Sequence, residues 1–267
     1  MAPAYLSIAF DRRLFLKSSA VLGALACAGA LAGCGDAAGP AAEGEAPAAA
    51  PAVTGPTVPE LNGSAADASS PSPQGRTAVV YFSVPLTDSP SRDADSGASI
   101  VESGGDLLGN VQYAAQYVAA ATGGDLLRIE TEVPYATDDV IFDYALEEQH
   151  SNARPEISLV ALDGSRVDDL SAYDTVLVGY PIWWYELPMP LYTFFENYDL
   201  SGKRVAPFVV HGGSGLSGTV QDIEALQPDA DVEEDGLSIN RRDVQANAEA
   251  SVGAWVESLG LSERNPS

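Results

Sequence analysis

From residue 77 onward, short apolar runs rich in β-branched residues alternate with segments whose apolar positions have helical spacing. The candidate strands are 78–82, 126–129, 175–179, 205–210 and 237–239, and the candidate helices are 110–122, 138–150, 191–198, 218–226 and 244–259. A strand followed by a helix, repeated five times, predicts a parallel sheet with helices on both faces. The sequence therefore predicts one domain of the α/β class over residues 77–262.

The N-terminal third of the chain has a different composition. Arg12 and Arg13 precede Leu-Phe-Leu-Lys and an apolar run too short to span a membrane, which resembles a twin-arginine export signal. The sequence Leu-Ala-Gly-Cys that ends at Cys34 resembles the lipobox of bacterial lipoproteins. We therefore expect a signal peptide over 1–33, lipidation at Cys34 and a disordered, Ala/Pro/Ser-rich tether over 34–76. The alternatives are an ordinary N-terminal helix and a secreted product without lipid.

Charge and cysteine content exclude several classes of function. The chain has 38 acidic and 13 basic residues and a net charge of −25, so nucleic acid is not expected as a partner, and a macromolecular partner should present a basic patch. The two cysteines, Cys27 and Cys34, both precede the predicted domain, and His150 and His211 are its histidines. We therefore expect no metal site, and any phosphate should be bound by neutral donors.

In sheets of this class, ligands bind at the carboxyl ends of the strands, where three loops have unusual compositions. The first loop begins at Ser83 and ends at Gly109 and Asn110, which open a helix. The free N–H groups at a helix start can bind phosphate without a formal charge. The alternative is an Asn that caps the helix and binds no ligand.

The second loop contains the adjacent residues Trp183 and Trp184, bracketed by prolines, and the third is a glycine-rich segment that begins at His211. Two neighbouring indoles in a short loop favour a flat ligand that stacks on them. Alternatively, one Trp packs beneath the loop and the other meets a partner. His211 is a candidate to hydrogen-bond the ligand or a substrate, or else a loop histidine with a structural partner.

Taken together, the segments Val-Tyr-Phe-Ser (80–83), Gly-Tyr-Pro-Ile-Trp-Trp (179–184), Pro-Met-Pro (188–190) and His-Gly-Gly-Ser-Gly (211–215) resemble the flavodoxin-like family, in its bacterial branch with the Trp-Trp loop. This resemblance implies a three-layer sandwich with a five-stranded parallel sheet in the order 2-1-3-4-5. It also implies FMN, with the phosphate at Ser83 and the first helix and the ring between the other two loops. The implied cofactor-binding residues are Ser83, Val84, Asn110, Val111, Gln112, Pro181, Ile182, Trp183, Trp184, His211, Gly212, Gly213 and Gly215.

The chain departs from the family in its phosphate loop, which is usually a compact Ser-x-Thr-Gly-Asn-Thr. Here residues 84–108 are inserted after Ser83, and Val111 stands where the family has its final Thr. Gln112 or Thr87 would have to replace that hydroxyl donor. We expect the insertion, which is rich in Asp, Ser and Gly, to form a surface lobe beside the flavin.

No nucleophile–base pair, metal cluster or pair of carboxylates occurs near the three loops, so a cofactor should carry the chemistry. The sequence predicts an FMN redox protein outside the cytoplasm, either an electron carrier or a small flavin oxidoreductase, tethered to the membrane only through its lipid. Its partner would be a redox protein or a small electron donor or acceptor. The acidic surface should disfavour the anionic reduced flavin. The alternatives are an NAD(P)H-dependent quinone or azo reductase and a flavin-free binding module.

Overall fold

The computed structural model describes residues 75–85, 100–137 and 140–262 of the 267-residue chain. The predicted signal peptide 1–33, Cys34 and nearly all of the tether 34–76 lie outside these residues. The middle of the insertion 84–108, with Thr87, also lies outside them. Within the described ranges, no helix has the length and apolar character needed to cross a bilayer.

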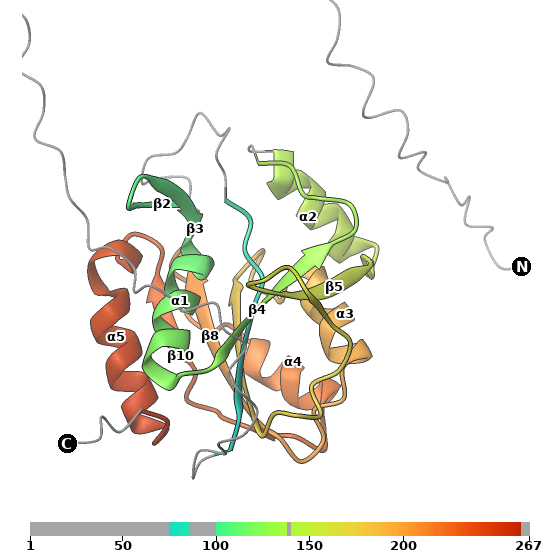
Figure 1. Cartoon of the computed structure of the whole chain (residues 1–267). Coiled ribbons are helices and arrows are strands. Elements are labelled where there is room, and N and C mark those ends of the chain that lie inside the picture. The colour runs from blue at the N-terminus through green and yellow to red at the C-terminus, as the bar shows by residue number, and fades with distance from the viewer. Residues whose placement is uncertain (1–74, 86–99, 138–139, 263–267) are drawn as a thin grey trace, which may run out of the picture. The chain divides into compact units, whose positions relative to one another are not determined.

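The described chain is an α/β sandwich around a mostly parallel sheet (Figure 1). The strands are β1 (Thr77–Tyr81), β2 (Ile100–Ser103), β3 (Asp106–Gly109), β4 (Asp125–Thr131), β5 (Ile157–Ala161), β6 (Arg166–Val167), β7 (Thr175–Pro181), β8 (Arg204–His211), β9 (Asp231–Val232) and β10 (Leu237–Asn240). The helices are α1 (Asn110–Thr122), α2 (Val140–His150), α3 (Met189–Asn197), α4 (Thr219–Leu226) and α5 (Val244–Ser258). The α/β class predicted from the sequence is confirmed.

Five of the parallel strands lie in the order β4-β1-β7-β8-β10, which is the order 2-1-3-4-5 in chain sequence. The sheet is wider than the five strands expected. Beyond β4, strands β5 and β6 add antiparallel pairs, and β9 pairs with the start of β8. Strands β5 and β6 form a hairpin whose turn is closed by bonds from Gly164 N–H to Ala161 O (2.9 Å) and from Ser165 N–H to Asp163 Oδ1 (2.9 Å).

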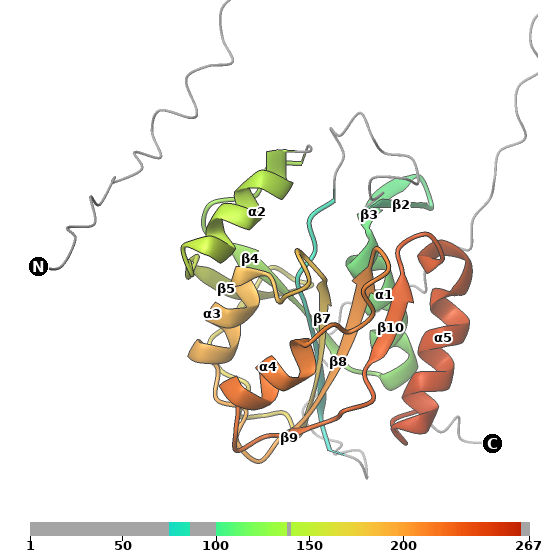
Figure 2. The ribbon, with the colours of Figure 1, turned by 180° about the vertical axis from the view of Figure 1, so that it is seen from behind.

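The strand residues alternate between two apolar layers, as the two-residue period of a strand requires. Val79 and Tyr81 pack into the layer under α1 and α5, and Ala78 and Val80 pack into the layer under α3 and α4. Figure 1 shows α1 and α5 side by side over one face, and Figure 2 shows α3 and α4 over the other. The carboxyl ends of the parallel strands are thus brought to one edge of a sheet that is buried on both faces.

Pro207 lies inside β8 but does not interrupt the hydrogen bonds between β8 and its neighbouring strands. The N–H of Arg204 donates to Asp174 O on the β7 side (3.0 Å), whereas Val205 O and His211 O accept bonds on the opposite side. Odd-numbered residues of β8 therefore face away from β7. Pro207 faces the interval between β9, which pairs with Arg204 and Val205, and β10, whose pairing starts at Phe208. A missing N–H costs no ladder bond at that position.

The end of the insertion forms a hairpin that leads directly into α1. Gly104 and Gly105 have φ angles of 62° and 94° and make the two-residue turn between β2 and β3. Positive φ at both turn positions matches the twist of the hairpin and favours glycine. The side-chain amide of Gln245 on α5 donates to Glu102 O at 3.0 Å. This part of the insertion is therefore attached to α5.

Candidate functional site

The three strand-end loops meet at a cleft of about 80 Å³ at the carboxyl ends of β1, β7, β8 and β10. Its lining residues are Ser83, Val84, Asn110, Val111, Phe142, Pro181, Ile182, Trp183, Val210, His211, Gly212 and Arg241. Nine of the thirteen cofactor-binding residues expected from the sequence are in this lining, and they come from all three loops. The expected residues Gln112, Trp184, Gly213 and Gly215 lie outside the lining.

Backbone hydrogen bonds continue from the sheet into the loops and fix their relative positions. The N–H of Phe82 donates to Gly179 O (2.9 Å), and that of Ile182 donates to Val210 O (3.0 Å). Beyond β10, the N–H of Arg241 donates to His211 O (2.8 Å). Each loop therefore leaves the sheet in register with its neighbour, so the cleft is built on a rigid edge.

The first loop touches the start of α1. A Cβ added to Gly109 would lie 2.1 Å from Ser83 Oγ, so only glycine leaves room for this hydroxyl. Gly109 is the N-cap of α1, and the first turn of this helix contains no acidic residue. The Gly109 N–H donates to Gln112 Oε1 (3.4 Å), so Gln112 caps the helix instead of lining the cleft. A hydroxyl and a helix start without nearby carboxylates form a suitable site for an anion.

The second loop folds into a two-residue hairpin with an uncommon composition. Trp183 N–H donates to Glu186 O (3.3 Å), and Glu186 N–H donates to Trp183 O (3.0 Å). The two residues between them, Trp184 and Tyr185, have φ angles of 50° and 68°. Such turns usually place Asn or Gly at these positions, because bulky side chains are strained at positive φ. Strain of this kind, about 1–3 kcal/mol per residue, concentrates at functional sites.

The adjacent indoles point into different surroundings. Trp183 is half-buried, lines the cleft and packs edge-to-face against Phe82 (5.4 Å between ring centroids) and Tyr135 (5.5 Å). Trp184 is 46 % exposed, and its indole N–H donates to Phe142 O on α2 (3.0 Å). The two rings therefore do not line the cleft as a pair, and Trp183 alone contributes an aromatic wall from this loop.

The hairpin is attached to the third loop on its other side. Ser217 Oγ donates to Tyr185 O (2.6 Å), and the buried hydroxyl of Tyr180 donates to Thr219 Oγ1 at the start of α4 (2.9 Å). These bonds hold the second and third loops together independently of any ligand.

His211 presents a defined tautomer to the cleft. Its Nδ1 accepts a hydrogen bond from the Gly213 N–H (2.9 Å), a bond for which Gly213 adopts a φ of 138°. Burial lowers the pKa of His211 below its usual value, which favours the neutral ring. Because Nδ1 is the acceptor, the proton of the neutral ring lies on Nε2. His211 is therefore a neutral hydrogen-bond donor at the cleft.

Arg241 is the functional candidate that the sequence reasoning missed. It follows β10, and a Cβ added to Gly212 would lie 3.2 Å from its Nη1, so the guanidinium lies against Gly212. The cleft therefore contains a permanent positive charge in addition to the neutral donors expected for a phosphate. The strand-end rule could have found Arg241, because it applies equally to the residue that follows the last parallel strand.

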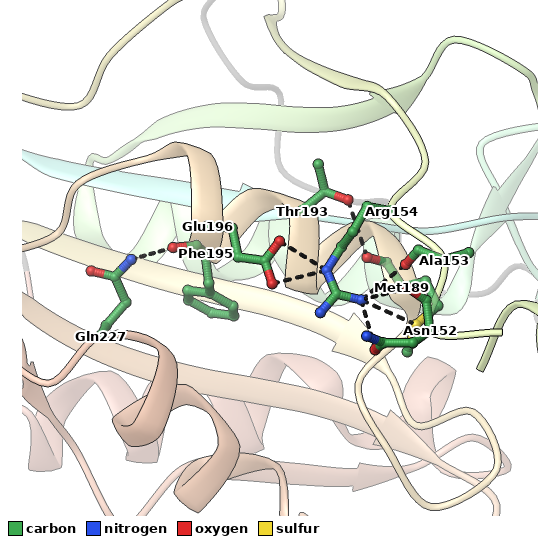
Figure 3. Close-up of polar contacts among 8 residues, drawn as sticks. All are labelled: Asn152, Ala153, Arg154, Met189, Thr193, Phe195, Glu196 and Gln227. Carbon is green, nitrogen blue, oxygen red and sulfur yellow. Dashed lines mark hydrogen bonds and ion pairs between the residues drawn. The ribbon is translucent and has the colours of Figure 1, made fainter. Parts of the chain in front are cut away.

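Helix α3, which begins directly after the second loop, is held at its last turn by side chains from outside the helix (Figure 3). Arg154 Nε donates to both carboxylate oxygens of Glu196 (2.9 and 2.8 Å), and its Nη1 donates to the carbonyl of Ala153 (3.0 Å). In the same turn of α3, the amide of Gln227 donates to Phe195 O. These contacts hold the helix that supports the Trp hairpin.

A doubly wound sheet in the order 2-1-3-4-5, with a cleft at the ends of β1, β7 and β8, defines a flavodoxin-like protein. Residues 106–259 match the family model described as Flavodoxin, which covers more than half of the chain. The chain belongs to the flavodoxin family.

Solved structures agree with this assignment. A candidate flavoprotein from Bacteroides uniformis is 26% identical, with a TM-score of 0.51 over 68% of this chain and 98% of that chain. A candidate flavoprotein from Bacteroides eggerthii is 25% identical, with a TM-score of 0.50 over 69% of this chain and 98% of that chain. No curated protein matches the sequence.

Proposed function

We propose that this chain binds FMN non-covalently and acts as a redox protein outside the cytoplasm, either as an electron carrier or as a small flavin oxidoreductase. The observation that carries the proposal is the convergence of three loops on one cleft. That cleft combines a hydroxyl at a helix start, one face of aromatic and apolar residues, and a neutral imidazole donor. Membership of the flavodoxin family and the likeness to the two Bacteroides proteins support it.

The residues of the cleft fit the parts of FMN. Gly109 has no Cβ, so the Ser83 hydroxyl lies directly against the start of α1. The phosphate would accept hydrogen bonds there from the Ser83 hydroxyl and from backbone N–H groups of α1. Ile182 and Trp183 offer an apolar wall for the ring. His211 would donate from Nε2 to a ring heteroatom. When bound, FMN supplies one- and two-electron transfer, and the protein orients it and limits its exposure to water.

The location is proposed from the sequence. The adjacent arginines, the short apolar run and the Leu-Ala-Gly-Cys that ends at Cys34 support export and lipid attachment. The twin-arginine route exports proteins that are already folded, so it suits a protein that must acquire its cofactor in the cytoplasm.

The visible spectrum of the chain without residues 1–33 tests flavin binding, because bound flavin gives characteristic absorption bands. Ser83→Ala should weaken FMN binding at least roughly tenfold, since a hydrogen bond to a charged group contributes about 1.5–3 kcal/mol. It should leave the affinity for riboflavin, which lacks the phosphate, unchanged. A colourless protein that does not quench FMN fluorescence on titration would instead support a flavin-free binding module.

A glycine substitution tests the phosphate end independently. Gly109→Ala places a methyl group 2.1 Å from Ser83 Oγ and should weaken FMN binding. Gly218→Ala is the matched control, because Gly218 is also an N-cap glycine with negative φ, and nothing lies within 4 Å of its added Cβ. Equal FMN affinities for the two variants would remove the Ser83–Gly109 contact from the site.

A further inference from the structure

Arg241 gives the cleft a charge opposite to that of the whole chain. Among the described residues that line the cleft, it is the one with a formal charge, and none of them is a carboxylate. The full chain, in contrast, has a net charge of −25. The local field at the cleft therefore differs from the field expected from composition.

The position of Arg241 is set by the backbone and by its contact with the third loop. Its N–H donates to His211 O (2.8 Å), its guanidinium lies against Gly212, and its Nε atom is buried. An arginine side chain keeps its proton at all ordinary pH values. The neighbouring imidazole favours its neutral form, because burial lowers the pKa of His211. Arg241 thus supplies the permanent positive charge at this end of the cleft.

We propose that Arg241 tunes the flavin, favouring its anionic reduced form over its oxidised form. This inference rests on the proposed function. Oxidised FMN takes up two electrons and one proton to give the anionic hydroquinone, so the ring gains one negative charge on reduction. A fixed positive charge at the cleft stabilises the form that carries the extra negative charge. Arg241 therefore opposes, at the ring, the effect that the acidic surface was expected to have.

The phosphate of FMN is the other negative group that the Arg241 guanidinium could stabilise. The geometry favours the ring, because Arg241 contacts Gly212 of the third loop, whereas the expected phosphate donors, Ser83 and the start of α1, belong to the first loop. The two roles differ in what they change. If Arg241 interacts with the ring, it alters the ratio of affinities for reduced and oxidised flavin, both for FMN and for riboflavin. If Arg241 interacts with the phosphate, it alters the affinities for the two redox states of FMN equally.

The experiment is a spectroelectrochemical titration of the flavin-loaded protein, with dithionite as the reductant. Arg241→Gln should reduce the ratio of affinities for reduced over oxidised FMN about tenfold, which lowers the two-electron midpoint potential by about 30 mV. Arg241→Lys keeps the charge and should retain most of the wild-type potential. Arg241→Met is a second neutral variant, which retains apolar contacts of the stem. Arg242→Gln is the matched control, because Arg242 is adjacent, exposed and absent from the cleft lining.

Two results would overturn the inference. Equal potential shifts in Arg241→Gln and Arg242→Gln would show that only the overall charge matters. An unchanged potential, with or without weaker binding of FMN in both redox states, would remove the role at the ring. Failure of the proposed function is distinguishable, because then the wild-type protein itself would bind no flavin. Thermal unfolding of each variant identifies any that fail to fold.

Discussion

At the scale of single residues, the two adjacent tryptophans show how the backbone conformation of a turn determines which side chain lines the cleft. The positive φ of Trp184 turns the chain immediately after Trp183, so the side chains leave the hairpin in different directions. Trp183 faces the cleft against Phe82, and Trp184 binds the backbone of α2. Sequence adjacency alone indicated an aromatic loop but could not assign the two rings, because that assignment depends on the backbone conformation of the turn.

Trp183→Ala should weaken FMN binding about tenfold, whereas Trp184→Ala should change it by less than about twofold. The reason is that aromatic contacts contribute about 0.5–1.5 kcal/mol beyond the buried area, and only Trp183 lines the cleft. Fluorescence titration with FMN measures both affinities. The paired variants remove the same side chain from neighbouring positions. Equal losses would mean that Trp184 also reaches the flavin.

The environment of His211 predicts that the stability of the fold decreases in mild acid. Burial lowers the pKa of His211 in the folded state below its value of about 6.5 in the unfolded chain. The stability that this shift contributes is therefore present above about pH 6.5 and is lost as the pH falls through the folded-state pKa. Protonation of Nδ1 would also break the bond from the Gly213 N–H. His211→Asn should flatten the fall in unfolding midpoint between about pH 7 and 5.

The other histidine provides the control for this prediction. His150 is exposed in the last turn of α2 and does not line the cleft, so His150→Asn should keep the wild-type pH dependence. If His150→Asn flattened the curve and His211→Asn did not, the acid sensitivity would have to be assigned to α2.

At the scale of elements, strong local signals made α1 and the central strands predictable. The apolar spacing of 110–122 and the glycine that follows, which adopts a φ of 65°, define the helix that the structure contains. Hairpin β5–β6 was missed because residues 157–167 form short antiparallel strands inside a connection, where no helix signals a crossover. Hairpin β2–β3 was missed because its Gly104-Gly105 turn lies within a segment rich in Asp, Ser and Gly.

Substitution of Gln227 tests how the carboxyl end of α3 is held in place. Its side chain accepts from Leu200 N–H (3.2 Å) and donates to the carbonyls of Phe195 and Tyr198, the latter at 3.0 Å. Gln227→Leu leaves these backbone groups without their bonds and should lower the free energy of unfolding by about 1–3 kcal/mol. Urea denaturation measures this change.

The exposed Gln221 on α4 is the matched position, and Gln221→Leu should change the free energy of unfolding by less than about 0.5 kcal/mol. Similar effects of the two substitutions would show that the buried amide does not hold the end of α3.

At the scale of the whole molecule, a strongly acidic chain contains a cleft in which Arg241 is the permanently positive residue among the described lining residues. We propose that this net charge attracts partners with a basic patch, and the attraction should weaken as salt rises. The cleft lies at the edge of the sheet where the parallel strands end, and the described residues that line it come from the loops that follow these strands.

The N-terminal third should determine where the protein resides. In a bacterial host that processes lipoproteins, we expect the full chain in the membrane fraction and Cys34→Ser in the soluble extracytoplasmic fraction. The physical reason is that each buried CH₂ of an acyl chain contributes about 0.8 kcal/mol to membrane binding, and only Cys34 follows a lipobox-like sequence. Cys27→Ser removes the other thiol and should stay in the membrane fraction. Immunoblots of the fractions measure the distribution, and Cys34→Ser retained in the membrane as fully as Cys27→Ser would contradict lipid attachment at Cys34.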